Sequence, residues 1–415
     1  MTLEPLWGII NLDYSQNKQI QEVRHLSTHK QVPDIRFKGF HEEWELRKLS
    51  DIADITMGQS PNGANYTDNP NDHILVQGNA DMKNGVVVPR VWTTQITKTA
   101  NAGDLILSVR APVGDVGRTD YDIVIGRGVS AIKGNDFVYQ TLLKLKSDGY
   151  WKSLSTGSTF ESINSTDIKN ASIITPTLPE QEQIGTFFKT LDKLITLQQR
   201  KLDLLKTQKQ GYLQKMFPKP GMAVPELRFK GFDEEWEVKK LGDIGSVAMN
   251  KRIFKEQTTE CGDVPFFKIG TFGREPDAYI SRNLFEEYKL KYPYPEIGDV
   301  LISASGSIGR TVVYTGKDEY FQDSNIVWLK HDDQLDNQFL NQFYSIVKWH
   351  GLEGSTIKRL YNKNILDTDI SLPSLEEQSK IGAFFKQLDN NISLQQQKLD
   401  LLKTQKQGFL QKMFP

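Results

Sequence analysis

The chain is 415 residues long, and its 51 basic and 52 acidic side chains leave a formal net charge of −1. With 38% hydrophobic residues, this length suffices for two or more domains of ordinary size. The single cysteine, Cys261, excludes an intramolecular disulfide and a cysteine-built zinc site, and it suits a reducing compartment. No apolar run approaches the length of a membrane-spanning helix, so we expect a cytoplasmic protein without a membrane partner.

Residues 1–31 carry no periodicity that predicts a helix or a strand. The segment "LWGII" is too short for a membrane span and lacks the basic flank and cleavage pattern of a signal peptide. We therefore treat residues 1–31 as a leader of unknown role.

The rest of the chain consists of two tandem copies of one unit. Each copy begins with a header, "VPDIRFKGFHEEWELRKLSDI" from Val32 and "VPELRFKGFDEEWEVKKLGDI" from Val224. Each copy ends with a tail, and the 18 residues "KLDLLKTQKQGYLQKMFP" from Lys201 recur from Lys398 with only the tyrosine replaced by phenylalanine. The segments between header and tail, called the middles below, are unalike. The repeat predicts two variable domains, 32–178 and 219–372, and two repeated helices, 179–218 and 373–415.

The middles predict mixed domains with many strands and few helices. In the first, "HILVQGNADMKNGVVVP" and "GDLILSVRAPVGDVGRT" alternate apolar stretches with glycine and asparagine turns. In the second, "VPFFKIGTFG" and "GDVLISASGSIGRTVVYT" occupy the corresponding places. Short helices are predicted to follow at "FVYQTLLKLKSDG" and "QFLNQFYSIVKWHG".

The tails predict two long helices of the coiled-coil type. Apolar residues recur at alternating steps of four and three over more than four heptads in each copy. The seam positions expected to pair the helices are Ile184, Phe188, Leu191, Ile195, Leu202 and Leu205 in the first tail, and Ile381, Phe385, Leu388, Ile392, Leu399 and Leu402 in the second. Gly211 and Gly408 each cost about 1 kcal/mol relative to alanine in a helix, so the last turns are expected to bend or fray.

Chain connectivity favours antiparallel pairing of the two helices, because a parallel pair would need a long return path before the second middle. The expected fold class is α+β, with two mixed α/β domains separated by two long antiparallel coiled-coil helices in a pseudo-two-fold tandem repeat. At about 1.5 Å per residue, Ile184 to Met216 spans roughly 50 Å. Gln198 and Gln395 interrupt the seams near their midpoints. Two interpretations are equally open: the glutamines form a buried pair that fixes the register, or both side chains lie at a solvated edge.

Three motifs recur in order in this chain: "GDVLISASGSIGRT", then "GST" ahead of a strand ending in proline, then "LPSLEEQSKIGAFFKQLD" before a long helix. This order, present twice, resembles the specificity subunit (HsdS) of type I restriction-modification systems. The resemblance covers residues 32–415 and implies two target-recognition domains, each reading one half of a bipartite site on double-stranded DNA. It also implies that the chain is not an enzyme.

The same resemblance implies partners for the chain. Two DNA methyltransferase subunits, and ATP-driven restriction subunits in the full complex, are expected to assemble on it. S-adenosylmethionine, ATP and Mg²⁺ are accordingly expected on those partners, with no cofactor and no metal on this chain. A rod of about 50 Å matches about 15 base-pair steps of 3.4 Å, so the helices are expected to set the spacer between half-sites.

Charge and motifs leave alternatives open. Residues 50–175 carry 11 basic against 13 acidic side chains and residues 242–372 carry 15 against 19, which is less basic than a free-standing DNA-binding domain. The sequence has no GxxxxGK[ST] phosphate loop and no methyltransferase motif of the "NPPY" kind. A coiled-coil scaffold that binds proteins without reading DNA, and a specificity module for a fused nuclease and methyltransferase, are the other two hypotheses.

Candidate DNA contacts follow from residue type, because bases are read mainly by Arg, Lys, Asn and Gln, and phosphates by Lys, Arg and Ser. In the first middle they are Arg90, Lys98, Arg110, Arg118 and Arg127, with Ser158 and Thr159 in the "GST" turn. In the second they are Ser305, Ser307, Arg310, Lys358, Arg359, Tyr361, Asn362 and Lys363, of which the last five are predicted to share a loop.

Overall fold

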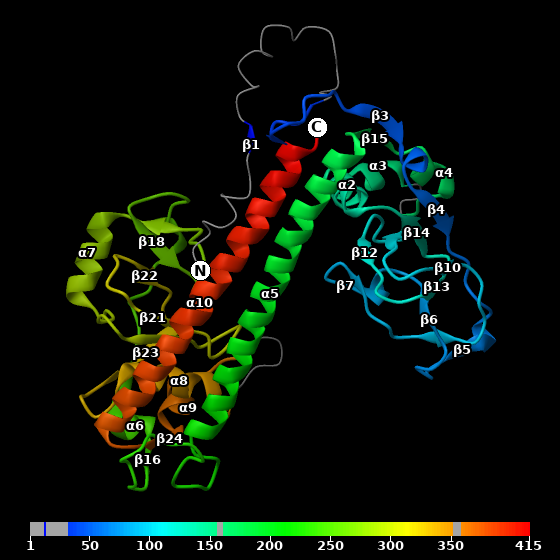
Figure 1. Cartoon of the computed structure of the whole chain (residues 1–415). Helices are drawn as coiled ribbons and strands as arrows, with labels where there is room; N and C mark the ends of the chain where they lie inside the picture. The colour runs from blue at the N-terminus through cyan, green and yellow to red at the C-terminus, as the bar shows by residue number, and fades with distance from the viewer. Residues whose placement is uncertain (1–11, 14–31, 156–160, 352–357) are drawn as a thin grey trace. The chain divides into compact units, whose positions relative to one another are not determined.

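The computed structural model describes residues 12–13, 32–155, 161–351 and 358–415 (Figure 1). The chain divides into two compact units, a first unit of Met1–Gln199 with Lys398–Pro415 and a second unit of Arg200–Gln397. Two long helices, α5 (Leu178–Met216) and α10 (Leu375–Met413), each contribute a segment to both units. Each unit therefore combines one middle with parts of both tails.

The first unit is built on two larger sheets, whose strands follow the order β10-β13-β6-β9-β5 and β4-β14-β11-β12-β8-β7. Its elements before α5 are β1 (Leu12–Asp13), β2 (Arg36–Phe37), β3 (Glu45–Lys48), η3 (Leu49–Asp51), β4 (Asp54–Met57), η4 (Gly63–Asn65), β5 (Tyr66–Thr67), β6 (His73–Val76), η5 (Asn79–Asp81), β7 (Met82–Lys83), β8 (Val86–Val87), β9 (Trp92–Thr93), β10 (Thr99–Ala100), β11 (Leu105–Ser108), β12 (Val116–Arg118), β13 (Ile123–Ile125), β14 (Val129–Lys133), α2 (Asp136–Ser147), α3 (Tyr150–Leu154), α4 (Ser165–Lys169) and β15 (Ser172–Thr175).

The central strand β11 is buried on both faces, which explains why its sequence is a continuous apolar run. Leu105 and Leu107 pack in a core with Val138 and Leu142 of α2. Ile106, which points the opposite way in a strand, packs in a second core formed by the two sheets. The sheets thus enclose one core between them and a second under α2.

The second unit repeats this plan with other residues. Its elements between the long helices are β16 (Glu237–Lys240), α6 (Leu241–Ile244), β17 (Gly245–Ala248), η6 (Lys255–Gln257), β18 (Val264–Phe267), β19 (Tyr279–Ile280), α7 (Arg282–Lys291), β20 (Val300–Ser303), β21 (Thr311–Val313), β22 (Tyr320–Phe321), β23 (Ile326–His331), α8 (Asn337–Ile346), α9 (Asn362–Leu366) and β24 (Asp369–Leu372). The larger sheets have the orders β17-β23-β20-β21 and β19-β18-β22. Val300 and Ile302 pack towards Phe339 of α8, whereas Leu301 packs in the core on the opposite face.

The short helices predicted after the strands are confirmed as α2 and α8. The side chain of Asn135 accepts a hydrogen bond from the backbone N–H of Val138 at 3.0 Å, and Asp336 accepts one from Phe339 at 2.9 Å. Such N-caps contribute about 1 kcal/mol each and determine where the helices begin. The prediction of two mixed middles is thereby confirmed as well.

The long helices pair in antiparallel fashion, as predicted. In the first unit, Phe187 of α5 contacts Phe409 of α10 edge to face at 5.1 Å. Farther along α5, Asp192 binds Lys406, which precedes Phe409 on α10, so the residue numbers rise on one helix and fall on the other. In the second unit, Lys209 binds Asp389 and Tyr212 contacts Phe384, which gives the same antiparallel direction (Figure 1).

The predicted seam residues differ in burial. Ten of the twelve are buried or packed on a core cluster: Ile184, Phe188, Leu191, Ile195 and Leu402 in the first unit, Ile381, Phe385 and Leu388 in the second, and Leu202 and Leu399, which are 0% and 1% exposed. Leu205 and Ile392 are half-buried. Gln395 is buried and Gln198 is half-buried, so the interpretation that both side chains are solvated is wrong.

The expected fraying at Gly211 and Gly408 is wrong, because α5 continues to Met216 and α10 to Met413. Leu213 and Met216 are buried in the core of the second unit, and Met413 in that of the first. Burying one such side chain contributes about 1.5–3 kcal/mol, which outweighs a glycine cost of about 1 kcal/mol.

Header and tail meet in space and form the frame of each unit. β3 of the first header pairs with β15, which leads into α5, and β16 of the second header pairs with β24, which leads into α10. Arg36 forms two hydrogen bonds of 2.7 Å with Glu180 at the start of α5, and both side chains are buried. Arg228 and Glu377 form the same pair in the second unit at 2.7 and 2.8 Å.

Candidate nucleic-acid interface

A basic groove of about 700 Å³ lies on the first unit beside the end of β11. Three of the predicted contacts, Arg90, Arg110 and Arg127, line it together with Gln77 and other polar residues. Among the described residues that line this groove, Asp81 is the single acidic one. The groove is therefore positively charged although the domain as a whole is slightly acidic.

Asp81 stabilises the backbone of the groove wall more than it neutralises the positive charge of the arginines. Its carboxylate accepts backbone hydrogen bonds from Gln77 at 2.8 Å and Gly78 at 3.3 Å, and the residue is only 5% exposed. The other oxygen lies 3.2 Å from Nε of Arg90, whose side chain is 55% exposed. Asp81 thus holds the turn after β6 and orients Arg90 at the wall of the groove.

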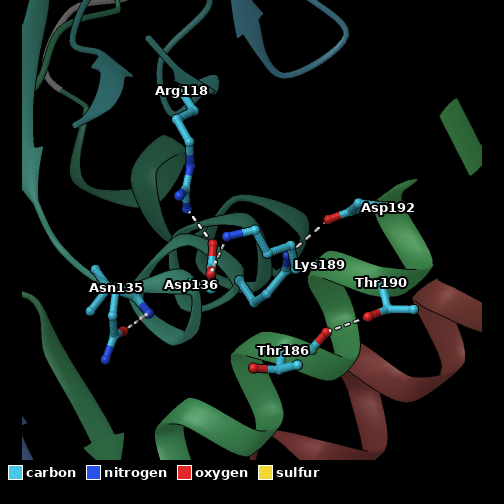
Figure 2. A network of polar contacts seen from close by, with 9 residues as sticks. Arg118, Asn135, Asp136, Thr186, Lys189, Thr190 and Asp192 are labelled. Atoms are coloured by element: carbon cyan, nitrogen blue, oxygen red, sulfur yellow. Dashed lines mark hydrogen bonds and ion pairs between the residues drawn. The ribbon is translucent and has the colours of Figure 1, made fainter. Parts of the chain in front are cut away.

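Arg118 is placed elsewhere, in a network that joins the sheet to the long helix (Figure 2). Nη2 of Arg118 donates to Asp136 at 2.5 Å, and Nζ of Lys189 on α5 donates to the other Asp136 oxygen at 3.1 Å. The guanidinium also lies 5.6 Å from the ring of Tyr139. Burial and the nearby Asp192 raise the pKa of Tyr139 to about 12, so its hydroxyl stays neutral. Arg118 therefore serves the fold, and it is not part of the groove.

The remaining candidates of the first middle are placed as follows. Lys98 is exposed ahead of β10, its carbonyl accepts a hydrogen bond from Ile125 at 2.8 Å, and it does not line the groove. Ser158 and Thr159 lie outside the described residues.

In the second unit the structure brings the two candidate clusters together. Ser305 pairs with Arg359 in an antiparallel bridge, and the Leu360 N–H donates to the Ala304 carbonyl at 2.8 Å. Ser305 is buried and its hydroxyl donates to Asn325 at 2.7 Å, so it supports the turn. Arg310 also has a partner within the protein, because its Nη1 donates a hydrogen bond to the Phe272 carbonyl at 3.0 Å.

The side chains left at the surface around this bridge are Ser307, Lys358, Arg359, Tyr361, Asn362 and Lys363. The predicted common loop for the last three is wrong. Asn362 and Lys363 form the first turn of α9, and Tyr361 is its N-cap residue. The helix forms because the Asn364 side chain accepts the Tyr361 N–H at 3.2 Å and because Ile365 is buried in the core.

Sequence reasoning also missed residues that shape both units. Gln77 and Asn79 line the groove, and their signal was the glycine turn "VQGNAD" after a strand. The two Arg–Glu pairs, one buried and one partly buried, had a signal too, since all four residues recur in the repeated headers and tails. Lys209 and Lys406, which interrupt the predicted seams, are partners of Asp389 and Asp192 at 2.6 Å.

Besides Leu178 and Leu375 at their first residues, the long helices expose four leucines at repeated positions farther along their length. In the first unit, Leu197 is 50% exposed and Leu401 is 46% exposed. They lie five residues beyond Asp192 and five before Lys406, so the antiparallel register places them at corresponding levels. Leu204 and Leu394 hold the equivalent positions in the second unit and are 58% and 47% exposed. Single exposed apolar side chains are common on protein surfaces, so it is their recurrence in both repeats that makes these leucines a candidate docking face.

Within the described part of the chain, no group of three or more His, Cys, Asp or Glu side chains is arranged to hold a metal ion. The described helices include none that is long and apolar enough to cross a membrane.

Comparison with known proteins identifies the family. The model of the type I restriction modification DNA specificity domain matches residues 41–207 and 233–404, and the chain belongs to this family. The chain is 56% identical over 165 residues to a Haemophilus influenzae protein provisionally assigned as type I restriction enzyme specificity subunit S.HindORF215P. This match covers 39% of the chain and 43% of the relative, so the chain spans less than half the length of that protein.

Other relatives match along most of the chain. The type I restriction enzyme MjaIX specificity subunit of Methanocaldococcus jannaschii is 23% identical, over 90% of this chain and 93% of its own length. The crystal structure of the type I restriction-modification S subunit from M. genitalium matches with a TM-score of 0.66 at 16% identity, covering 92% of this chain and 99% of that one. At this identity the structural match establishes the shared fold.

Proposed function

We propose that the chain supplies the DNA sequence specificity of a type I restriction-modification complex and catalyses no reaction itself. Its two readers, residues 32–178 and 219–372, each read one half of a bipartite site on double-stranded DNA. The observation that carries the proposal is the presence of two specificity domains that share one repeated frame but differ in their middles. A shared frame with unlike readers suits a protein that recognises two unlike half-sites.

The basic groove supports DNA reading by the first unit. Arg90, Arg110 and Arg127 line it, and arginine is the commonest reader of guanine and also a phosphate ligand. Gln77 and Asn79 add the amide groups that bind adenine. Because the middles carry slightly more acidic than basic residues, the chain alone is expected to bind DNA weakly. Partner subunits then supply much of the phosphate neutralisation.

The long helices suit the role of spacer between the half-sites. Each has 39 residues, which at about 1.5 Å per residue corresponds to about 58 Å, or about 17 base-pair steps of 3.4 Å. The repeated leucines on these helices suit the docking of methyltransferase subunits, one for each repeated pair of positions. Restriction subunits join through that complex. S-adenosylmethionine, ATP and Mg²⁺ belong to those partners, and the assembly works on DNA in the cytoplasm.

Single-molecule methylation mapping of host DNA, with and without this gene, tests the proposal. We expect a methylated bipartite motif that is present only with the gene. Replacing residues 50–175 with the corresponding segment of a relative should change one half of the motif and leave the other intact. A methylation pattern that is independent of the gene, or an exchange that alters both halves together, would reject the two-reader function.

A further inference from the structure

The two readers share one local structure at the turn that follows their central strand, although the turn sequences differ. Four backbone hydrogen bonds of 2.7–3.1 Å match between β11 and β20 and the segments around them. In the first unit the backbone N–H groups donate to carbonyl oxygens in the pairs Ser108 to Asp115, Gly114 to Ser108, Val109 to Gly128 and Ile163 to Val109. In the second unit the corresponding pairs, in the same order, are Ser303 to Arg310, Gly309 to Ser303, Ala304 to Asn325 and Leu360 to Ala304. These matches make Arg110 the equivalent of Ser305, and Ser162 the equivalent of Arg359.

An isolated antiparallel bridge joins these positions in each unit. It pairs Arg110 with Ser162 in the first unit and Ser305 with Arg359 in the second. Each bridge therefore carries one arginine and one serine, and the two residues have exchanged strands between the readers. A purely structural bridge would not need a guanidinium at all.

The exchange leaves the guanidinium at the same place. Residues that face each other in an antiparallel pair have Cβ atoms about 4.5–5.5 Å apart and point to the same side of the sheet. An arginine side chain is longer than that separation, so it covers the same surface from either strand. The serine opposite is small and leaves this surface to the arginine.

Both arginines are available for a ligand. Arg110 and Arg359 are exposed, and neither side chain forms a hydrogen bond or ion pair with another residue that the structure describes. By contrast, Arg118 is bound to Asp136 and Arg310 to the Phe272 carbonyl. Arg110 moreover lines the basic groove of the first unit.

We propose that this single guanidinium is the guanine-reading group of each reader, supplied by Arg110 for the first half-site and by Arg359 for the second. The inference rests on the proposed function and adds which side chain reads the DNA in each unit and which base it reads. Arginine presents two parallel N–H groups that match O6 and N7 of guanine in the major groove, which lysine cannot do with one ammonium group.

Selection from a randomised duplex library tests the proposal, using the full chain in complex with its methyltransferase subunits. Arg110→Ser should remove the guanine preference at one position of the first half-site, with about 5- to 150-fold weaker binding of the original site. The second half-site should keep its full preference, which reports that the complex is folded. Arg359→Ser should do the converse.

The exchanged variant Arg110→Ser with Ser162→Arg is the sharpest arm, because it copies the arrangement of the second unit into the first. It should regain the guanine preference that Arg110→Ser loses. Arg110→Lys keeps the charge but not the paired donors, so it should lose the preference as well. Arg47→Ser removes an exposed charge of the same unit outside the groove and should change no base preference.

The outcomes separate cleanly. If Arg110→Ser weakens binding equally for every sequence and lowers the salt slope by about one, Arg110 contacts phosphate and the inference is overturned. An unchanged preference in Arg110→Ser and Arg359→Ser, or an exchanged variant that behaves like Arg110→Ser, also overturns it. If the wild-type complex selects no sequence at all, the proposed function itself fails.

Discussion

Replacing Phe217 by alanine is expected to destabilise the second unit, although this residue belongs to the first tail. Phe217 is 6% exposed and stacks on Phe339 at 5.1 Å, and its ring meets that of Trp236 edge to face at 6.0 Å. Truncation of a phenylalanine in such a core costs about 3–5 kcal/mol, from lost apolar burial and the cavity that remains. The opening free energy of the second unit should fall by this amount.

Hydrogen exchange measured separately for each unit is the suitable assay, because a chain with two compact units need not unfold in one transition. The slowest amides of β20 and β23 should exchange about two to four orders of magnitude faster in Phe217→Ala, while those of β11 and β14 keep their rates. Phe414→Ala should instead accelerate exchange in β11 and β14 and leave β20 and β23 unchanged, since Phe414 stacks on Phe137 in the first unit with ring centroids 5.2 Å apart.

Tyr212→Phe is the matched control for this experiment. It introduces the residue that the second copy carries naturally, on a side chain that is 37% exposed, and should change neither unit measurably. Acceleration in the first unit caused by Phe217→Ala, or equal acceleration in both, would refute the idea that each tail completes the unit of the other repeat.

Three further predictions concern the frame, the partner and the spacer. Glu180→Gln should cost the first unit about 3–5 kcal/mol, because it leaves the buried Arg36 guanidinium without its counter-charge. Denaturant unfolding followed within that unit measures the cost, and a loss below about 1 kcal/mol would contradict the role of the pair. Leu197→Glu with Leu401→Glu should halve the number of methyltransferase subunits that co-purify with each chain, because the pair Leu204 and Leu394 stays intact, and should leave stability within about 0.5 kcal/mol, since both side chains are half exposed. An unchanged ratio of methyltransferase subunits to chain would exclude these leucines from the docking face. One heptad added at the midpoint of both α5 and α10 should lengthen the spacer by about three base pairs, because seven residues rise about 10 Å. Methylation mapping that returns the original spacer would show that the helices do not set it.

Much of the fold could be predicted from the sequence where one local pattern decides the outcome. The heptad seams predict α5 and α10 because a sustained apolar stripe of helical period can be buried only by a helix. The runs around Leu105 and Val300 predict strands, and the structure places them centrally, where burial on both faces explains why they are apolar without alternation. The first turn of α9 escaped prediction because a side-chain cap at Asn364 and burial of Ile365 override a polar sequence that is typical of loops.

The candidate site could be predicted only in part, as its arginines illustrate. Residue type alone placed Arg110 and Arg118 in one class of DNA contacts. The structure separates them, because Asp136 lies within hydrogen-bonding distance of Arg118 whereas Arg110 has no such partner among the described residues. The serine and arginine exchange across the bridge was equally invisible, since its two residues are about fifty positions apart in the sequence.

The sequence by itself determined that the protein is a tandem repeat of header, variable middle and helical tail, because duplication and periodicity are properties of the linear chain. Only the tertiary structure decided which repeat each part serves. The end of the first tail packs against Trp236 of the second header, and the end of the second tail packs against Trp44 of the first. The physical reason is the antiparallel pairing of α5 and α10, which carries each buried phenylalanine to the opposite unit, where it completes a core that the local sequence leaves open.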